Sequence, residues 1–283
     1  MIDFLFTPFE NYLFLKRALI ACLALSLSCA PLGVLIVLRR MSLMGDALSH
    51  SALPGVAIGY TIAGLSLPAM SLGGFIAGLM VALMAGIVSR RTILKEDASL
   101  VGFYLIALAV GVVIVSLNGS KIDLLRILLG SVLAVDQASL ILVASVSSFT
   151  LITLALLYRP LIIEFFDPSF MKSIRGRGSF YHMTFIVLVV ANMVAALHTL
   201  GTLMALGIMM LPAIAARFWA RSVMGLFGVA AGIAFLSSYG GLVLSYHYSW
   251  PTGPSIILAC GVSYVASMLM GRQGSYRHKS YNP

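Results

Sequence analysis

The sequence predicts an all-α polytopic membrane protein with eight to nine transmembrane helices. Of its 283 residues, 60% are hydrophobic and only 10% are charged, whereas about a quarter of the residues of a soluble domain are charged. Mean hydropathy is +1.05. Apolar runs of about 20 residues, the length that crosses a bilayer as a helix, follow one another along the chain. We therefore expect one transmembrane domain, residues 1–283, and no second folded domain.

Nine apolar segments are expected to cross the membrane. The second contains polar residues and Pro54-Gly55, so we expect a broken helix there. The seventh is short and contains Pro212; if it dips into the bilayer without crossing, eight spans remain. The nine segments are residues 16–38, 43–67, 70–88, 99–117, 137–158, 180–198, 201–218, 222–246 and 253–271.

Lysine and arginine residues indicate the orientation, because they gather in the cytoplasmic loops of membrane proteins. Five basic clusters fall on one side if nine spans alternate, which places the C-terminus in the cytoplasm and the N-terminus outside. The net charge of +9 belongs to this pattern, so we do not interpret it as a nucleic-acid surface. Lys16, Arg17 and Lys121 fall on the opposite side. The clusters are Arg39 and Arg40; Arg90, Arg91 and Lys95; Arg159, Lys172, Arg175 and Arg177; Arg217 and Arg221; and Arg272, Arg277 and Lys279.

The second span carries two ionisable residues, Asp46 and His50, four positions apart. A helix places such residues on one face, and ionisable groups inside a membrane usually mark a substrate path. At about 1.5 Å per residue, His50 would lie about 15 Å deeper than Arg40, near the midplane. Two copies of the pair across a dimer axis would offer two nitrogen and two oxygen ligands, which suits zinc, or manganese with added waters. The alternative is a structural hydrogen bond between the two side chains that closes a helix break.

The cytoplasmic segment at about residues 159–178 is expected to contain a short helix. Asp167 can cap it and Pro168 suits its first turn. Its apolar face would lie on the headgroups or enter a groove on a cytoplasmic partner. No lysine follows a glycine in this chain, so a Walker-type phosphate loop is excluded and any ATP-driven motor must be a separate subunit. The apolar face comprises Phe170, Met171 and Ile174, flanked by Lys172 and Arg175.

The remaining histidines and the cysteines carry weaker signals. His198 and His247 lie near the outer ends of spans, where each could be a metal ligand on the way in or an interfacial polar residue. His182 is expected to be cytoplasmic and exposed. The three cysteines lie inside apolar runs and are expected to be small buried side chains without disulfide or zinc-finger spacing.

The run from Arg40 to Ala57, which contains Met-Gly-Asp-Ala-Leu-Ser-His-Ser-Ala-Leu-Pro-Gly, closely resembles the signature of the ABC-3 family. These proteins are the membrane permeases of bacterial ABC importers for zinc, manganese and iron. The resemblance covers nearly the whole chain. Further matching segments are Lys95-Glu96-Asp97, Phe166 to Phe170, Gly201 to Ala213, and Pro251 to Ile257.

The resemblance implies a homodimeric permease of the type II ABC importer fold in the bacterial inner membrane. ATPase subunits would bind inside, and a metal-binding protein would deliver Zn²⁺ first, or Mn²⁺ next, as substrate outside. Such a subunit is no enzyme and holds no permanent cofactor, since ATP binds to its partner. Asp46 and His50 would handle the metal. The coupling residues would be Asp167, Pro168, Phe170, Met171, Lys172 and Ile174.

Two features depart from the family pattern. Ser249 stands where the family often has an acid, which weakens any metal ligand near Trp250. The sequence Arg175-Gly176-Arg177-Gly178 is more basic than expected after the coupling segment.

Two other classes of function stay open at the level of sequence. A proton-coupled secondary metal transporter would use Asp46 and His50 as its relay and would need no ATPase. An intramembrane enzyme would pair His50 with Ser49 or Ser51, but neighbours in sequence point away from each other on a helix.

Overall fold

A computed structural model describes residues 9, 12–64, 66–117, 135–173 and 176–273, and all regular structure within these ranges is helical. Each of the nine predicted segments contains one helix, and the short α8 lies between the fifth and the sixth. The helices are α2 (Leu13–Leu38), α3 (Leu43–Ala63), α4 (Leu67–Arg91), α5 (Glu96–Leu117), α7 (Gln137–Phe166), α8 (Pro168–Ser173), α9 (Gly178–Leu200), α10 (Thr202–Ala216), α11 (Val223–Tyr248) and α12 (Thr252–Met270).

Seven of these helices are long and apolar enough to cross a membrane. The two predicted spans outside this set are α3 and α10, the same two that the sequence made doubtful. With 15 residues, α10 reaches about 22 Å at 1.5 Å per residue, less than the roughly 30 Å of a hydrocarbon core.

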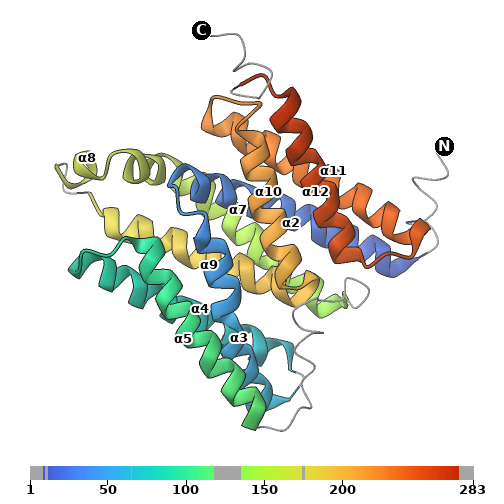
Figure 1. Cartoon of the computed structure of the whole chain (residues 1–283), viewed down its shortest axis with the longest axis horizontal. Coiled ribbons are helices and arrows are strands. Elements are labelled where there is room, and N and C mark those ends of the chain that lie inside the picture. The colour runs from blue at the N-terminus through green and yellow to red at the C-terminus, as the bar shows by residue number, and fades with distance from the viewer. Residues whose placement is uncertain (1–8, 10–11, 65, 118–134, 174–175, 274–283) are drawn as a thin grey trace.

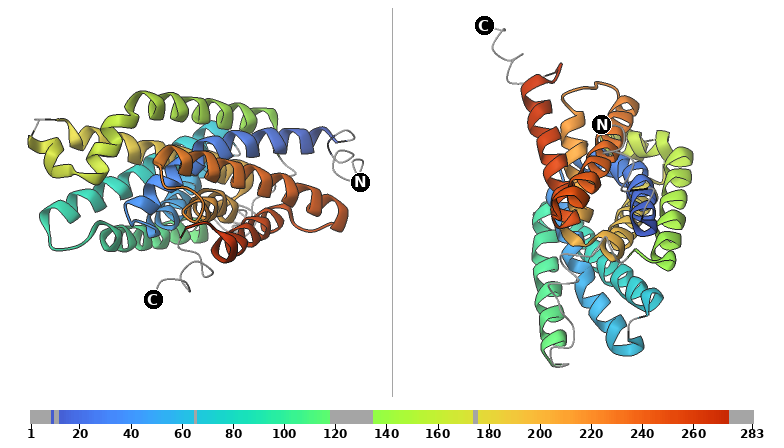
Figure 2. Two further views of the ribbon diagram at one scale, coloured as in Figure 1. Left: turned by 90° about the horizontal axis from the view of Figure 1, so that it is seen from above. Right: turned by 90° about the vertical axis from the view of Figure 1, so that its right-hand side faces the viewer.

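The helices form a bundle with α2 and α9 at its centre (Figures 1 and 2). On one side, α3, α4 and α5 pack against one another and α9 packs on α3 and α4. On the other side, α10, α11 and α12 pack together, and α10 and α11 cover α2, which also contacts α7 and α9. The central helices α2 and α9 therefore join the group of α3, α4 and α5 to the group of α10, α11 and α12. Helix α3 contacts α9 directly.

Polar side chains cross-link the centre of the bundle. The hydroxyls of Ser28 and Ser147 lie 3.0 Å apart and join α2 to α7. Asn192, fully buried on α9, donates from Nδ2 to the Thr150 hydroxyl at 2.6 Å, which joins α9 to α7. Such hydrogen bonds hold helices together in lipid, where the hydrophobic effect between helices is absent.

The expectation that the second span breaks at Pro54-Gly55 is wrong, because α3 runs unbroken from Leu43 to Ala63 with Pro54 inside it. The surrounding packing explains why. The Pro54 ring lies directly against Gly111 of α5. The backbone of Gly55 approaches the backbone of Gly73 on α4 so closely that a side chain at position 55 would clash with it. Pro54 still removes the N–H that would bond the carbonyl of His50, four residues earlier.

Candidate metal site

A tight turn fixes where α3 begins. Arg40 closes α2 in the left-handed conformation, with φ of 59°, and the Met41 N–H donates to the Ile36 carbonyl at 3.1 Å. This is the hydrogen-bond pattern of a Schellman cap. Only residues 39–42 separate α2 from α3, so the start of α3 is tied closely to the end of α2.

Asp46 and His50 lie together on one side of α3, as their spacing predicts. His50 Nε2 is 3.5 Å from Asp46 Oδ1, and the two side chains are 31% and 43% exposed on the single chain. The alternative role for the pair was a structural hydrogen bond that closes a helix break. The 3.5 Å separation is longer than a usual hydrogen bond, and α3 is continuous, so there is no break to close. From Leu43 to His50 the helix rises about 10 Å.

The His50 ring is held from one side and leaves one nitrogen without a partner. The Tyr104 ring of α5 stacks against it, with centroids 6.3 Å apart. Nδ1 of His50 is buried and has no hydrogen-bond partner. Tyr104 can therefore orient the imidazole so that Nε2 faces Asp46. An ion shared by the two side chains would approach Nε2.

One chain supplies too few ligands to enclose a transition metal. Among the described residues, no group of three or more His, Cys, Asp or Glu side chains could hold an ion. An ion at Asp46 and His50 would need further ligands from water, backbone oxygens or a second copy of the chain.

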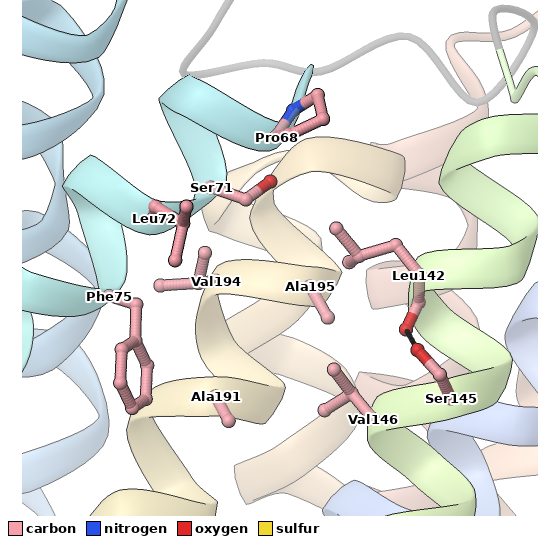
Figure 3. Close-up of a pocket in the computed structure, with 10 residues that line it drawn as sticks. All are labelled: Pro68, Ser71, Leu72, Phe75, Leu142, Ser145, Val146, Ala191, Val194 and Ala195. Atoms are coloured by element: carbon pink, nitrogen blue, oxygen red, sulfur yellow. Dashed lines mark hydrogen bonds between the residues drawn. The ribbon is translucent and has the colours of Figure 1, made fainter.

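An apolar pocket lies elsewhere in the bundle. It has a volume of about 310 Å³ and opens between α4, α7 and α9 (Figure 3). Ser71 faces it with a buried hydroxyl that has no hydrogen-bond partner. Its walls offer hydroxyls but no charged or imidazole group, so it does not suit a metal ion. The lining residues are Pro68, Ser71, Leu72, Phe75, Leu142, Ser145, Val146, Ala191, Val194 and Ala195.

His198 and His247 are separate from Asp46 and His50. His198 lies in the last turn of α9, where its Nε2 is buried without a partner and the ring hydrogen-bonds to the backbone of Met70. His247 is exposed at the end of α11, against the Tyr246 ring. Each histidine stands in the last turn of its helix, so any role in admitting metal is a separate one.

The predicted short helix is present as α8. Asp167 Oδ1 accepts a hydrogen bond from the Phe170 N–H at 2.9 Å, so Asp167 caps the helix and Pro168 begins it. The predicted apolar face is partly wrong, because Met171 is buried while Phe170 is 49% exposed. Phe166, which is 60% exposed, adds a second aromatic ring at this end. Ile174 lies outside the described residues, and the structure describes only the backbone of Lys172.

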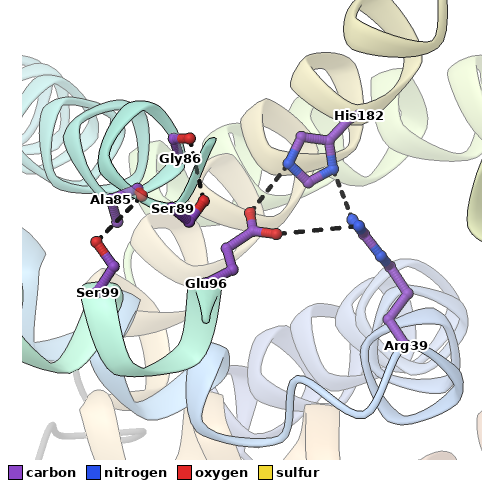
Figure 4. A network of polar contacts seen from close by, with 7 residues as sticks. All are labelled: Arg39, Ala85, Gly86, Ser89, Glu96, Ser99 and His182. Carbon is purple, nitrogen blue, oxygen red and sulfur yellow. Dashed lines mark hydrogen bonds and ion pairs between the residues drawn. The ribbon is translucent and has the colours of Figure 1, made fainter. Parts of the chain in front are cut away.

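Sequence reasoning missed a polar network where α2 ends and α5 and α9 begin (Figure 4). His182 was expected to be exposed, but it is only 5% exposed. Its Nε2 lies 3.0 Å from Glu96 Oε1, and its Nδ1 lies 2.6 Å from an Arg39 nitrogen. The available signal in the sequence was that α5 begins with the acids Glu96 and Asp97, while the arginines Arg39 and Arg40 follow α2.

Ser49 and Ser51 are both used by their own helix. The Ser49 hydroxyl donates to the Asp46 carbonyl at 2.8 Å, and the Ser51 hydroxyl donates to the Leu48 carbonyl at 2.9 Å. Both side chains are buried. Neither is placed to be activated by His50, so the arrangement disfavours an intramembrane serine enzyme.

Comparisons with known proteins agree with this architecture. The sequence model of the ABC 3 transport family matches residues 11–271. The manganese import system permease protein ScaB of Streptococcus parasanguinis is 30% identical over 95% of each chain. The manganese transport system membrane protein MntC of Halalkalibacterium halodurans is 31% identical over 96% of this chain and 93% of its own. A probable iron transport system membrane protein of Haemophilus influenzae is 32% identical over 95% and 94%.

Two solved structures are similar in fold. PsaBC from Streptococcus pneumoniae, in complex with Fab, superimposes with a TM-score of 0.86 at 28% identity and covers 99% of this chain and 100% of that one. An inward-facing metal-chelate type ABC transporter gives a TM-score of 0.69 over 89% and 84% of the two chains. At 12% identity, the second likeness concerns the fold alone.

Proposed function

This chain belongs to the ABC 3 transport family, and on that basis we propose that it is the membrane permease of an ATP-driven importer for manganese. The observation that carries the proposal is the Asp46–His50 pair, which α3 presents on one side, partly exposed and backed by Tyr104. The described helices, seven of them long and apolar enough to span a membrane, agree with a multi-pass membrane protein.

Manganese replaces zinc as the first choice of substrate. The sequence alone placed zinc first because two imidazoles and two carboxylates suit it. The relatives named above are manganese and iron proteins. Carboxylate and carbonyl oxygens together with water suit Mn²⁺, and Asp46 is the only acid between Glu10 and Glu96.

A homodimer would complete the site. Each chain offers one carboxylate and one imidazole on a partly exposed side of α3, so two chains meeting there would surround one ion with four protein ligands. Water would fill the remaining positions, and the incomplete protein shell would keep affinity moderate enough for the ion to leave. In this scheme an extracytoplasmic metal-binding protein delivers Mn²⁺ and the dimer alternates between outward and inward access.

A partner ATPase would bind at α8. The helix displays Phe170, with Phe166 beside it, and buried Met171 anchors it to the bundle. Exposed aromatic rings on a capped helix can insert into a groove of a cytoplasmic subunit. The proton-coupled alternative leaves these exposed rings and the family membership without an explanation.

Uptake of Mn²⁺ by the permease–ATPase complex in proteoliposomes tests the site. Asp46→Asn and His50→Gln should each abolish uptake, because they replace the carboxylate and the imidazole with neutral amides, which are weaker ligands, at similar side-chain size. Asp136→Asn is the matched control: Asp136 is a carboxylate that caps α7, and asparagine caps equally well. Wild-type uptake by both site variants would refute the site. Uptake without any ATPase would favour the proton-coupled transporter.

A further inference from the structure

Three ionisable side chains from three helices meet at the cytoplasmic end of the bundle (Figure 4). Arg39 caps the end of α2, Glu96 begins α5 and His182 lies in the second turn of α9. Arg39 and Glu96 are 3.9 Å apart, and their side chains are 21% and 22% exposed. Buried charges are costly unless they are paired and hydrogen-bonded, so each of these three groups depends on the other two.

The geometry fixes which histidine nitrogen carries the proton. A guanidinium group can only donate, so Nδ1 of His182 accepts from Arg39 at 2.6 Å. Nε2 therefore carries the hydrogen and donates it to Glu96 at 3.0 Å. His182 thus bridges the other two groups with an acceptor on one side of its ring and a donor on the other.

The network lies between the proposed ATPase contact and the metal helix. On the side of α8, His182 lies in the second turn of α9, the next helix after α8. The Arg39 guanidinium lies 4.6 Å from the centre of the Phe165 ring, which is just before α8 in the chain. On the other side, Arg39 is separated from the start of α3 at Leu43 by only three residues. A shift of α8 and its neighbours would therefore reach α3 through Arg39.

A second route runs from the same network through α5. Glu96 is the first residue of α5, and Tyr104 lies two turns further along that rigid helix. The Tyr104 ring stacks on His50, and α5 packs along α3. Movement of Glu96 would change the position of the ring that orients a proposed metal ligand.

We propose that the Arg39–His182–Glu96 network couples movement of α8 to α3, with His182 as the positioning residue that joins the two routes. This inference rests on the proposed function, in particular on α8 as the ATPase contact. With the network intact, α8, α9, α2 and α5 move together, and α3 follows. When the bridge is removed, the ATPase still turns over but α3 no longer follows it.

The test follows α3 directly in the permease–ATPase complex in proteoliposomes. An environment-sensitive fluorophore is placed on Ile62→Cys, which is 80% exposed near the outer end of α3. The native Cys22, Cys29 and Cys260 are buried, so the introduced cysteine is labelled selectively. Trapping the ATPase with ATP and vanadate should change the fluorescence. Mn²⁺ uptake and ATP hydrolysis are measured in the same vesicles.

Two variants each keep half of the bridge. His182→Asn retains an acceptor near the Nδ1 position, and His182→Gln retains a donor near the Nε2 position. Both should lose the fluorescence response and import less Mn²⁺ per ATP hydrolysed, by roughly 5- to 150-fold, the usual size of coupling between sites. Arg91→Gln, which removes an exposed charge at the end of α4, should behave as the wild type.

The outcomes separate this proposal from the proposed function. A normal response and a normal Mn²⁺-to-ATP ratio in both His182 variants would overturn the coupling role. If they do not assemble, Arg39→Lys, which keeps the charge but loses the planar fork, decides by the same two readouts. A wild-type complex that imports no Mn²⁺ would contradict the proposed function. A fluorescence response that the His182 variants abolish would still support the network.

Discussion

Replacing Gly55 with alanine tests the close contact that places α3. A Cβ atom at this position would lie 1.9 Å from the Gly73 carbonyl oxygen, whereas ordinary contact begins at 3.4 Å. Because the obstacle is backbone, α3 and α4 would have to separate by about 1.5 Å, the difference between these distances. Overpacking of this kind costs about 1–3 kcal/mol, and a backbone clash belongs at the upper end.

The same displacement should impair transport, because α3 carries Asp46 and His50. A misplacement of about 1 Å can cost about 100-fold in an activity that depends on geometry. We expect Gly55→Ala to lower the thermal unfolding midpoint of the purified complex and to reduce Mn²⁺ uptake strongly. Gly86→Ala on α4 is the control, since a Cβ there meets nothing within 4 Å. Equal midpoints and equal uptake for the two variants would refute the reasoning.

Three further predictions concern two helix ends, at Asp136 and Arg40, and the exposed ring of Phe170 on α8. Asp136→Ala should destabilise the protein by about 1 kcal/mol at neutral pH through loss of the α7 cap. Hydrogen bonds from the Ser139 side chain first, and from its N–H, hold the pKa of the Asp136 carboxyl below its usual value. The deficit should therefore shrink as pH falls below about 4, where the wild type also loses its carboxylate. A pH-independent deficit in chemical unfolding would contradict this. Arg40→Gly should stabilise by about 1 kcal/mol, because φ is 59° there and glycine accepts that conformation freely; a lower unfolding midpoint would count against it. Phe170→Glu should lower Mn²⁺ imported per ATP while the exposed Ser173→Glu does not, and an unchanged ratio in Phe170→Glu would exclude the docking role.

Local rules predicted the features that depend on neighbours in sequence. The cap at Asp167 and the start of α8 at Pro168 follow from side-chain chemistry within one turn, and both are present. The common side of Asp46 and His50 follows from the helical repeat. Alternating apolar runs and turns likewise predicted one helix for each span, even for short α10.

Contacts between distant helices were beyond such rules. His182 looked cytoplasmic and exposed because it follows a basic segment. Its burial depends on Arg39, 143 residues away, and on Glu96, 86 residues away. Pro54 was expected to break α3, but packing against Gly111 and the Gly55–Gly73 contact keep it helical. For Phe170 and Met171, helical periodicity suggested one shared face, and only the packing of α8 on the bundle separates them.

The polar cross-links at the centre of the bundle have a consequence for biosynthesis. Cys29 meets Asn192 163 residues later in the chain, which at roughly 5–20 residues per second is about 8–33 s of translation. Helix α2 must therefore wait in the lipid before its polar partners on later helices are made. Ser28 is suited to that wait, since its hydroxyl also reaches the Ala24 carbonyl of its own helix at 3.1 Å. A newly synthesised α2 can thus satisfy the Ser28 hydroxyl within its own helix. The hydrogen bond between Ser28 and Ser147 forms once α7 is inserted.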